Sequence, residues 1–358
     1  MYIWGCCAFI GAIILNFMIQ NKKYYFFVLF LFMAIVVGIR DVYTGTDTLM
    51  YYSFVDVVAR EGIVLSDQSN VNMEIGFRAL MFICGAILDS PQSLIFISSI
   101  LTYALFARYL YRNSGQRYYY IAAILFIGMG FFIESMNAMR QLLALSIAVN
   151  GLEFLKHNKY IEAIIVVVLS CLFHSSMALL ILLIIFYIIA NKFIKRDGNN
   201  ILVFLGSLLL LTIIGINIAD IINNNIELIG GYAIYYTSAE YAEVGSGGWI
   251  RFIFILTIIL VESFFCISKN KRAYNMMLML AAEFGLVSIY LTNTWMFIFY
   301  RFYYEFFIFV IVILINILQK IKSPMVNICF QILIVLISGA NMHKQLNDAS
   351  DTNYNVFF

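Results

Sequence analysis

Long apolar runs separated by short polar segments make up most of the chain. A helix needs about 20 predominantly apolar residues to cross a bilayer, and most of these runs approach that length. The runs are continuous rather than alternating, which indicates α-helices. We expect membrane spans near 2–20, 24–39, 92–111, 118–133, 138–155, 160–173, 175–191, 201–222, 249–267, 273–291, 295–318 and 325–340.

The composition agrees with this pattern. The 358 residues are 63% hydrophobic and 12% charged, and the mean hydropathy is +0.92. A soluble domain with that balance would precipitate. We therefore predict an all-α polytopic membrane protein of about 12 transmembrane helices, within a range of roughly 11–14, that forms a single domain over residues 1–358. The first apolar run lacks a basic segment before it and a cleavage pattern after it, so we expect it to be a retained span.

Charge and cysteine usage exclude several classes of function. The net charge is only +2 and there is no basic tail, so nucleic acid is not an expected partner. All six cysteines lie inside apolar runs without metal-ligand spacing, which favours a packing role. We therefore expect no metal and no cofactor.

Short basic loops set the expected orientation, because cytoplasmic loops carry an excess of Lys and Arg. These loops lie at 22–23, 112–117, 156–159, 192–196, 269–272 and 320–322. The opposite, outer face then receives two long segments, 40–72 and 223–248, and loops of that length are usually functional. The polar stretch 341–358 is expected to be a C-terminal tail.

One short run breaks the alternation between the two sides. If 40–72 is outside and 112–117 is inside, an odd number of crossings must separate them, yet two apolar runs, 73–88 and 92–111, lie between. Because 73–88 is short and contains charged residues, Glu74 among them, we expect a re-entrant or partly inserted helix there. The alternative is that the charge rule fails at one loop.

The stretch 134–174 places two polar side chains in an apolar setting. Arg140 lies near one end, His174 at the other, and the basic turn 156–159 between them. Two antiparallel helices joined at this turn would put Arg140 about 24 Å and His174 about 22 Å from it, at about 1.5 Å per residue. We therefore expect both side chains at nearly the same depth on the outer face, although Glu134 is an alternative partner for Arg140.

Imidazole titrates near neutrality, so His174 is suited to accept a proton or to contact a phosphate. Asp47 and Glu74 are further candidate bases or ligands of a hydroxyl group. For Asp47 a helix N-cap is the alternative, and for Glu74 it is a solvated carboxylate at the membrane entry.

Two more arginines suggest an anionic ligand. Arg40 ends the second span, and its planar guanidinium can donate two hydrogen bonds to one phosphate, with interfacial anchoring as the alternative. Arg301 lies well inside an apolar run, where an arginine is costly unless it is paired or functional. Glu305, one helical turn on, or Glu283 in the preceding span could neutralise it.

Tyrosines are weaker candidates for stacking on sugar rings. An interfacial aromatic belt is the alternative for any one of them, because the chain has 24 tyrosines. The candidates for sugar binding are Tyr51, Tyr235, Tyr236 and Tyr303.

Three or four arginines, one histidine and several carboxylates thus gather on one predicted face, without a Walker loop, a Rossmann glycine pattern or a DxD-like metal pair. Such a face suits a lipid-linked donor whose leaving group is a phosphate or diphosphate. The arginines would stabilise charge that builds on the leaving group. A carboxylate or the imidazole would activate the acceptor hydroxyl.

The order of these motifs resembles the EpsG family of polysaccharide polymerases, which includes many Wzy-type O-antigen polymerases. The resemblance covers most of the chain. The matching features are Arg40…Asp47…Tyr51, Glu74-x-Gly76-Phe77, Arg140-Gln141-x-x-Ala144, Phe173-His174-x-Ser176 and Arg301-Phe302-Tyr303-Tyr304. The outer loop 223–248 is similar only in being rich in tyrosine.

The resemblance implies a glycosyltransferase of the GT-C type in the bacterial inner membrane, with its active face in the periplasm. Such an enzyme transfers the growing glycan from undecaprenyl diphosphate to the non-reducing-end sugar of an incoming undecaprenyl-diphosphate-linked repeat unit. It implies no nucleotide sugar and no metal. The implied partners are the two lipid-linked glycans, membrane lipids and, as a candidate, a chain-length regulator protein. By matching position, the diphosphate would be bound by Arg40, Arg140 and Arg301, and catalysis would use Asp47, Glu74 and His174.

Other functions of a similar architecture stay open. An O-antigen ligase or a transferase that uses a polyprenyl-phosphate sugar would need much the same site. A transporter or flippase of lipid-linked sugars predicts charged residues through the whole depth of the bundle, whereas the candidates here lie at one face. A purely structural membrane protein leaves Arg301 without an explanation.

Overall fold

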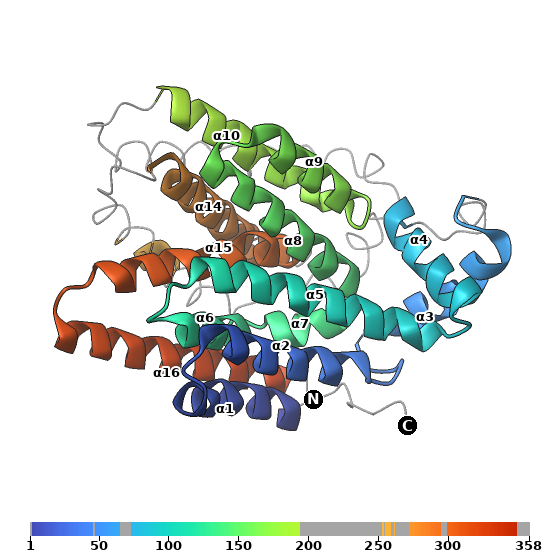
Figure 1. Ribbon diagram of the computed structural model, residues 1–358, viewed down its shortest axis with the longest axis horizontal. Helices are drawn as coiled ribbons and strands as arrows, with labels where there is room; N and C mark the ends of the chain where they lie inside the picture. The colour runs from blue at the N-terminus through green and yellow to red at the C-terminus, as the bar shows by residue number, and fades with distance from the viewer. Residues whose placement is uncertain are drawn as a thin grey trace. The chain divides into compact units, whose positions relative to one another are not determined.

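The computed structural model describes residues 2–45, 47–64, 73–193, 253, 255–258, 261, 272–294 and 299–348 (Figure 1). Throughout these residues the chain forms helices joined by turns, and no β-strand is present among them. The predicted span 201–222, the outer loop 223–248 with Tyr235 and Tyr236, and most of the predicted span 249–267 lie outside the described residues.

The helices group into two compact units, one formed by Met1–Leu182 with Ile321–Phe358 and the other by Leu183–Lys320. The described helices are α1 (Tyr2–Met18), α2 (Lys22–Gly38), α3 (Thr48–Glu61), α4 (Ile75–Phe82), the π-helical turn η2 (Ile83–Ile87), α5 (Pro91–Asn113), α6 (Tyr119–Gly128), α7 (Phe131–Asn137), α8 (Met139–Leu152), the 3₁₀ turn η3 (Glu153–His157), α9 (Tyr160–Cys171), the 3₁₀ turn η4 (Ser175–Ala178), α10 (Leu179–Phe193), α14 (Arg272–Thr294), α15 (Phe299–Lys320) and α16 (Pro324–Asp348).

Among the described residues, the structure holds fewer candidate membrane spans than the sequence pattern predicts. In the described part of the chain, five segments are long and apolar enough to cross a membrane, or six if the bent pair α6–α7 counts as one span. These five are Pro91–Asn113, Ser175–Lys192, Ala273–Thr292, Arg301–Lys320 and Pro324–Asn347. The predicted count of about 12 is therefore not supported, although several apolar helices still indicate a multi-pass membrane protein.

Within the described residues, the count differs because a hydropathy pattern does not show where a helix stops. Tyr2–Met18, Ile75–Ile87 and Tyr160–Cys171 are apolar helices but are short. In particular, Ile75–Ile87 is too short to cross about 30 Å of hydrocarbon at about 1.5 Å per residue. The predicted span 118–133 is interrupted, since α6 and α7 meet at an angle of 46°.

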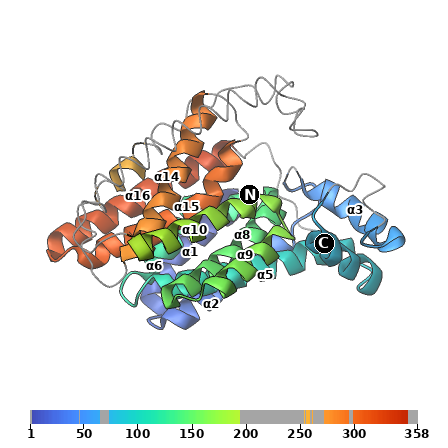
Figure 2. The same cartoon turned by 90° about the horizontal axis from the view of Figure 1, so that it is seen from above.

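In the unit that holds both ends of the chain, α5, α8 and α9 run alongside one another, and α3 and α4 form a lobe beyond one end of these helices (Figures 1 and 2). α2 also packs along α5, and α6 packs against α1 and α16. α4 of this lobe begins next to the start of α8 and the end of α9.

The break between α6 and α7 is stabilised by the last helix. An interrupted helix leaves carbonyl groups without their usual partners. Asn341 donates to the carbonyl of Gly128 at 2.6 Å, and Gln345 donates to that of Met129 at 3.4 Å.

A polar tail was expected over 341–358, but residues 341 to 348 continue α16. Residues 349–358 lie outside the described range.

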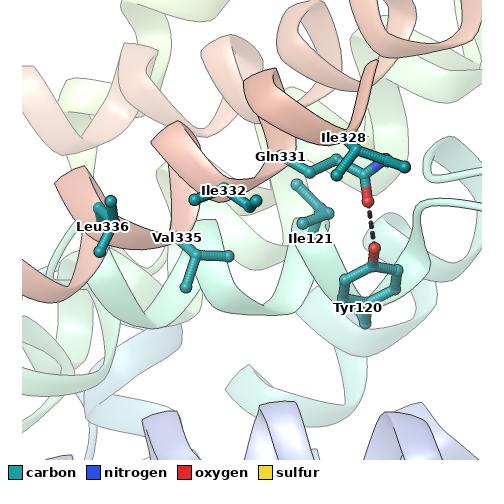
Figure 3. Close-up of a pocket in the computed structure, with 7 residues that line it drawn as sticks. All are labelled: Tyr120, Ile121, Ile328, Gln331, Ile332, Val335 and Leu336. Atoms are coloured by element: carbon teal, nitrogen blue, oxygen red, sulfur yellow. Dashed lines mark hydrogen bonds between the residues drawn. The ribbon is translucent and has the colours of Figure 1, made fainter. Parts of the chain in front are cut away.

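A shallow apolar cavity of about 330 Å³ lies between α6 and α16 (Figure 3). Tyr120 of α6 donates a hydrogen bond to Gln331 of α16 at its edge. The rest of the lining is aliphatic, including Ile328 and Leu336, which are largely exposed on the surface of the protein. Such a surface is expected for a helix that faces lipid.

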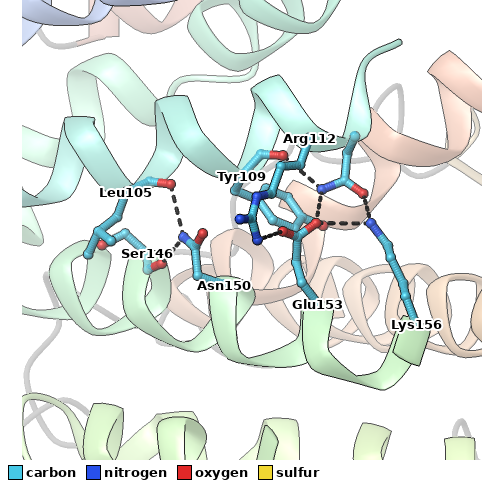
Figure 4. A network of polar contacts seen from close by, with 8 residues as sticks. Leu105, Tyr109, Arg112, Ser146, Asn150, Glu153 and Lys156 are labelled. Atoms are coloured by element: carbon cyan, nitrogen blue, oxygen red, sulfur yellow. Dashed lines mark hydrogen bonds and ion pairs between the residues drawn. The ribbon is translucent and has the colours of Figure 1, made fainter. Parts of the chain in front are cut away.

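A charged network joins α5 to the far end of α8 (Figure 4). The buried carboxylate of Glu153 contacts Arg112 at 3.3 Å and Lys156 at 2.9 Å, and it accepts a hydrogen bond from Asn113 at 2.7 Å. One turn earlier, Asn150 donates to the carbonyl of Leu105 in α5. These contacts fix α8 against α5 at the end opposite to Arg140.

In the other unit, α14 packs along α15, and the rings of Phe284 and Phe306 stack with centroids 5.0 Å apart. Two carboxyl side chains are almost wholly buried in this pair of helices, Glu283 at 1% and Glu305 at 0% exposure.

Candidate functional site

The hairpin that carries Arg140 and His174 forms where the sequence predicts it. α8 and η3 end at His157, and Asn158 adopts a left-handed conformation with φ of 55°. Asparagine tolerates this conformation better than most residues. The amides of Asn158 and Lys159 turn back to carbonyls of the preceding turn at 3.0 and 3.1 Å, and α9 then packs along α8. The hairpin returns the chain from the turn to the end of α8 where Arg140 lies.

The first turn of α4 docks onto the last turn of α9. The carbonyl of Leu172 accepts hydrogen bonds from the amides of Gly76 at 2.7 Å and Phe77 at 3.3 Å. Each contact satisfies groups that helix ends leave without partners. A Cβ atom on Gly76 would lie 2.7 Å from the same carbonyl oxygen. Glycine at position 76 therefore allows α4 to approach α9 closely enough to bring Glu74 beside His174.

An apolar cluster supports this junction, and it contains Tyr51, Val55, Val58, Met73, Phe77, Met81, Cys84, Leu94 and Met139, with Phe173 packed against it. Met73 directly precedes Glu74, Met139 precedes Arg140, and Phe173 precedes His174. Burying each such side chain contributes roughly 1.5–3 kcal/mol. The cluster thus fixes three backbone segments at positions next to the three polar residues.

Glu74, Arg140 and His174 meet at one point. Nη1 of Arg140 lies 2.7 Å from Oε2 of Glu74, and Nδ1 of His174 lies 3.4 Å from Oε1. The backbone amide of Ser175 donates to Oε1 at 2.8 Å. All three side chains are largely but not fully buried, with exposures of 19%, 15% and 12%. The expected proximity of Arg140 and His174 is present, and a carboxylate bridges them. We call Glu74, Arg140, His174 and the Ser175 amide the carboxylate cluster.

The cluster keeps Glu74 ionised. Burial by itself would raise the pKa of this carboxyl group, but the contact with His174, the charge of Arg140 and the Ser175 amide outweigh burial and lower its pKa to about 2. Glu74 lies before α4 and outside the five membrane-spanning candidates. A carboxylate with so low a pKa is a weak proton acceptor. It is better suited to orient His174 and to balance the charge of Arg140.

Arg40, the third predicted diphosphate ligand, is buried at the end of α2, and its diphosphate contact stays a prediction. Its side chain is 0% exposed and donates to the carbonyls of Val37 at 2.6 Å, Thr44 at 3.4 Å and Met136 at 3.3 Å. These contacts join the end of α2 to the end of α7. The Arg40 side chain thus anchors the end of α2 to α7. Its guanidinium does not take part in the carboxylate cluster.

Asp47 occupies the N-cap position of α3, although its side chain makes no capping hydrogen bond. The hydroxyl of Tyr51 lies 3.5 Å from Oδ2 of Asp47. Tyr51 is only 3% exposed, and its ring packs edge to face against Phe77 at 5.4 Å. Its contacts are those of a core residue, and the acceptor-binding role of Asp47 stays a prediction.

Arg301 lies in the first turn of α15, in the unit formed by Leu183–Lys320, and is partly buried. Its expected meeting with Arg140 therefore stays a prediction. Glu305 and Glu283, the candidate partners of Arg301, are buried in the same unit. Tyr303 is 1% exposed and packs against the ring of Phe307 at 4.2 Å, as expected of a core residue.

Two members of the site were not predicted. The Ser175 amide is a backbone group, so no residue type marks it. Gly76 belongs to the motif Glu74-x-Gly76-Phe77. A glycine near a helix start indicates close approach only once the neighbouring helix is known. Among the described residues, no group of three or more His, Cys, Asp and Glu side chains is placed to hold a metal ion.

The carboxylate cluster brings together a cation, a carboxylate and an imidazole. A guanidinium can bind an anion, and an imidazole oriented by a carboxylate can accept a proton from a hydroxyl. No curated protein and no solved structure matches the chain. The family model of the EpsG family, which is associated with Wzy-type polymerases, matches residues 23–357. The chain therefore belongs to the EpsG family.

Proposed function

We propose that the protein is a polysaccharide repeat-unit polymerase of the inner membrane, with its active face in the periplasm. It transfers a growing glycan from undecaprenyl diphosphate to the non-reducing-end sugar of an undecaprenyl-diphosphate-linked repeat unit. Family membership supports a polymerase-like activity. The observation that carries the finer proposal is the carboxylate cluster, which combines an anion-binding arginine with an oriented histidine.

In the proposed reaction, Arg140 contacts the diphosphate of the donor. The bond between the anomeric carbon and the diphosphate oxygen breaks, and the electron pair leaves with the lipid diphosphate, whose developing charge Arg140 stabilises. The acceptor hydroxyl oxygen forms the new bond to the same carbon. Its proton passes to Nε2 of His174, while Glu74 faces Nδ1 and holds the ring in the required orientation.

Three further predicted residues lie outside the carboxylate cluster, namely Arg301, Asp47 and Arg40. Arg301 is a candidate for a second contact with the diphosphate, and Asp47 for a ligand of the acceptor hydroxyl. Arg40 is the third candidate ligand of the diphosphate, and its guanidinium also donates to backbone carbonyls.

The proposal is tested by supplying the purified full-length protein with lipid-linked repeat units alone and resolving the products by size. The wild type should lengthen the units. A His174→Asn variant should lose activity by about 100-fold or more, the usual contribution of a general base. His157→Asn is the matched control, because His157 is exposed at the opposite end of the α8–α9 hairpin.

Equal chain extension by wild type and His174→Asn would overturn the assignment of the base. Transfer that occurs only when a lipid A–core acceptor is added would identify a ligase instead of a polymerase. Transport of the lipid-linked sugar without any new glycosidic bond would exclude both enzymes.

A further inference from the structure

The groups around Glu74 form an anion site in their own right. A guanidinium, a backbone amide and an imidazole converge on the two carboxylate oxygens, at 2.7, 2.8 and 3.4 Å. These donor types are also those that bind phosphate oxygens in proteins. A phosphate oxygen could therefore take the place of a carboxylate oxygen at one of these donors.

The two carboxylate oxygens have separate partners. Oε2 contacts Arg140, whereas Oε1 contacts His174 and the Ser175 amide. One contact can consequently be exchanged while the others persist. Arg140 also uses little of its donor capacity, since Nη1 makes its hydrogen bond to Glu74 and the buried Nε makes none within the described residues. A phosphate with higher charge could accept two parallel bonds from this guanidinium.

We propose that Glu74 closes the anion site in the resting protein, and that the diphosphate of the donor replaces Oε2 of Glu74 at Arg140 while Oε1 keeps its contacts with His174 and Ser175. The identity of the anion as a lipid diphosphate rests on the function proposed above. The exchange couples Arg140, which contacts Oε2 of Glu74, to His174, which contacts Oε1. Once Arg140 is engaged by the diphosphate, Glu74 keeps only its contacts with His174 and the Ser175 amide. Donor binding and the positioning of His174 are then linked through one carboxylate.

A permanent positioning role for Glu74 predicts the opposite behaviour. If Glu74 only held Arg140 in place, its removal would loosen the guanidinium and weaken diphosphate binding. If Glu74 competes with the diphosphate, its removal should strengthen binding. The sign of the change therefore separates the two roles.

The experiment measures binding of inorganic diphosphate to the detergent-solubilised full-length chain by calorimetry, for the wild type and for Glu74→Gln. We expect binding to become about three- to tenfold tighter in Glu74→Gln, which is the range for loss of a partly buried competing ion pair. A Glu74→Asp variant keeps the charge but shortens the side chain, and should give an intermediate affinity. If Glu74→Gln fails to fold, Glu74→Asp tests the exchange in its place, because it should still bind diphosphate more tightly than the wild type.

Two controls accompany these variants. Glu162→Gln removes an exposed carboxylate that contacts Lys159 in the first turn of α9, and should leave diphosphate affinity unchanged. The double variant Glu74→Gln/Arg140→Gln should lose the gain. Weaker binding in Glu74→Gln or Glu74→Asp, or a gain that persists without Arg140, would overturn the exchange.

The outcome is independent of polymerase activity. Tighter binding in Glu74→Gln together with a wild type that extends no repeat unit would retain the anion exchange and reject the proposed function. Extension of repeat units by the wild type together with weaker binding in Glu74→Gln would retain the proposed function and reject the anion exchange.

Discussion

At the scale of single residues, the carbonyl of Met136 determines how the segment after α2 meets α7. Arg40 donates to this oxygen at 3.3 Å and Thr48 donates at 3.2 Å. Gly45 passes beside it with φ of +91°, and a Cβ atom built there would lie 2.1 Å from the oxygen. Position 45 therefore needs glycine both for its backbone conformation and for lack of space.

Gly45→Ala should destabilise the protein by about 3 kcal/mol or more, because it combines a left-handed conformation with a clash against backbone. Gly62→Ala is the matched control, since Gly62 has φ of +85° but no atom within 4 Å of the added Cβ. It should cost only about 1 kcal/mol. Thermal unfolding in detergent measures both, and equal losses would show that the contact with Met136 has no energetic weight.

At the scale of helices, Arg40 and Arg140 differ in what they contact, although both were predicted to bind diphosphate. Arg40 joins the ends of α2 and α7 through carbonyl groups, whereas Arg140 at the start of α8 contacts a carboxylate from another segment. The contacts of Arg40 stabilise the packing of α2 against α7. The guanidinium of Arg140 can instead exchange its carboxylate partner for another anion.

The two arginines should therefore respond differently to substitution. Arg40→Gln leaves buried carbonyls without their donors and should lower the free energy of unfolding by about 3 kcal/mol, with diphosphate affinity of the folded protein unchanged. Arg140→Gln should weaken diphosphate binding by about tenfold with a smaller loss of stability. Unfolding curves and calorimetry on both variants decide this. Loss of diphosphate binding in well-folded Arg40→Gln would instead support Arg40 as a ligand of the diphosphate.

How much the sequence predicts depends on the type of element. The α8–α9 hairpin could be predicted because helical rise is constant, so Arg140 and His174 had to return to the same level. The place of Glu74 between them could not, because it depends on how α4 packs against α9. Within the described residues, the predicted number of spans is not supported, because hydropathy does not reveal short helices or the break before α7. The burial of Arg40 likewise depends on a carbonyl far away in the sequence.

At the scale of the whole molecule, the unit that holds the carboxylate cluster is made from the two ends of the described chain, Met1–Leu182 and Ile321–Phe358. α16 contributes to it by packing on α6 and α1 and by donating hydrogen bonds at the break between α6 and α7. The stability of the site-bearing unit should therefore depend on its last helix.

A chain that stops after Ser323, and so lacks α16, should be depleted in the membrane by about tenfold or more, because buried carbonyls and an apolar helix face lose their partners. A chain that stops after Asp348 keeps α16 and should accumulate normally. Immunoblots of membranes against an N-terminal tag measure both levels. Equal accumulation of the two truncated chains would show that α16 is dispensable for folding.

The hydrogen bond from Asn341 to Gly128 joins residues 213 positions apart. Since the ribosome synthesises the earlier residue first, the carbonyl of Gly128 acquires its final donor only after 213 further residues have been made. During that interval water or the insertion machinery has to solvate it. The joint between α6 and α7 therefore reaches its final hydrogen bonding only after α16 has been made and has packed against it.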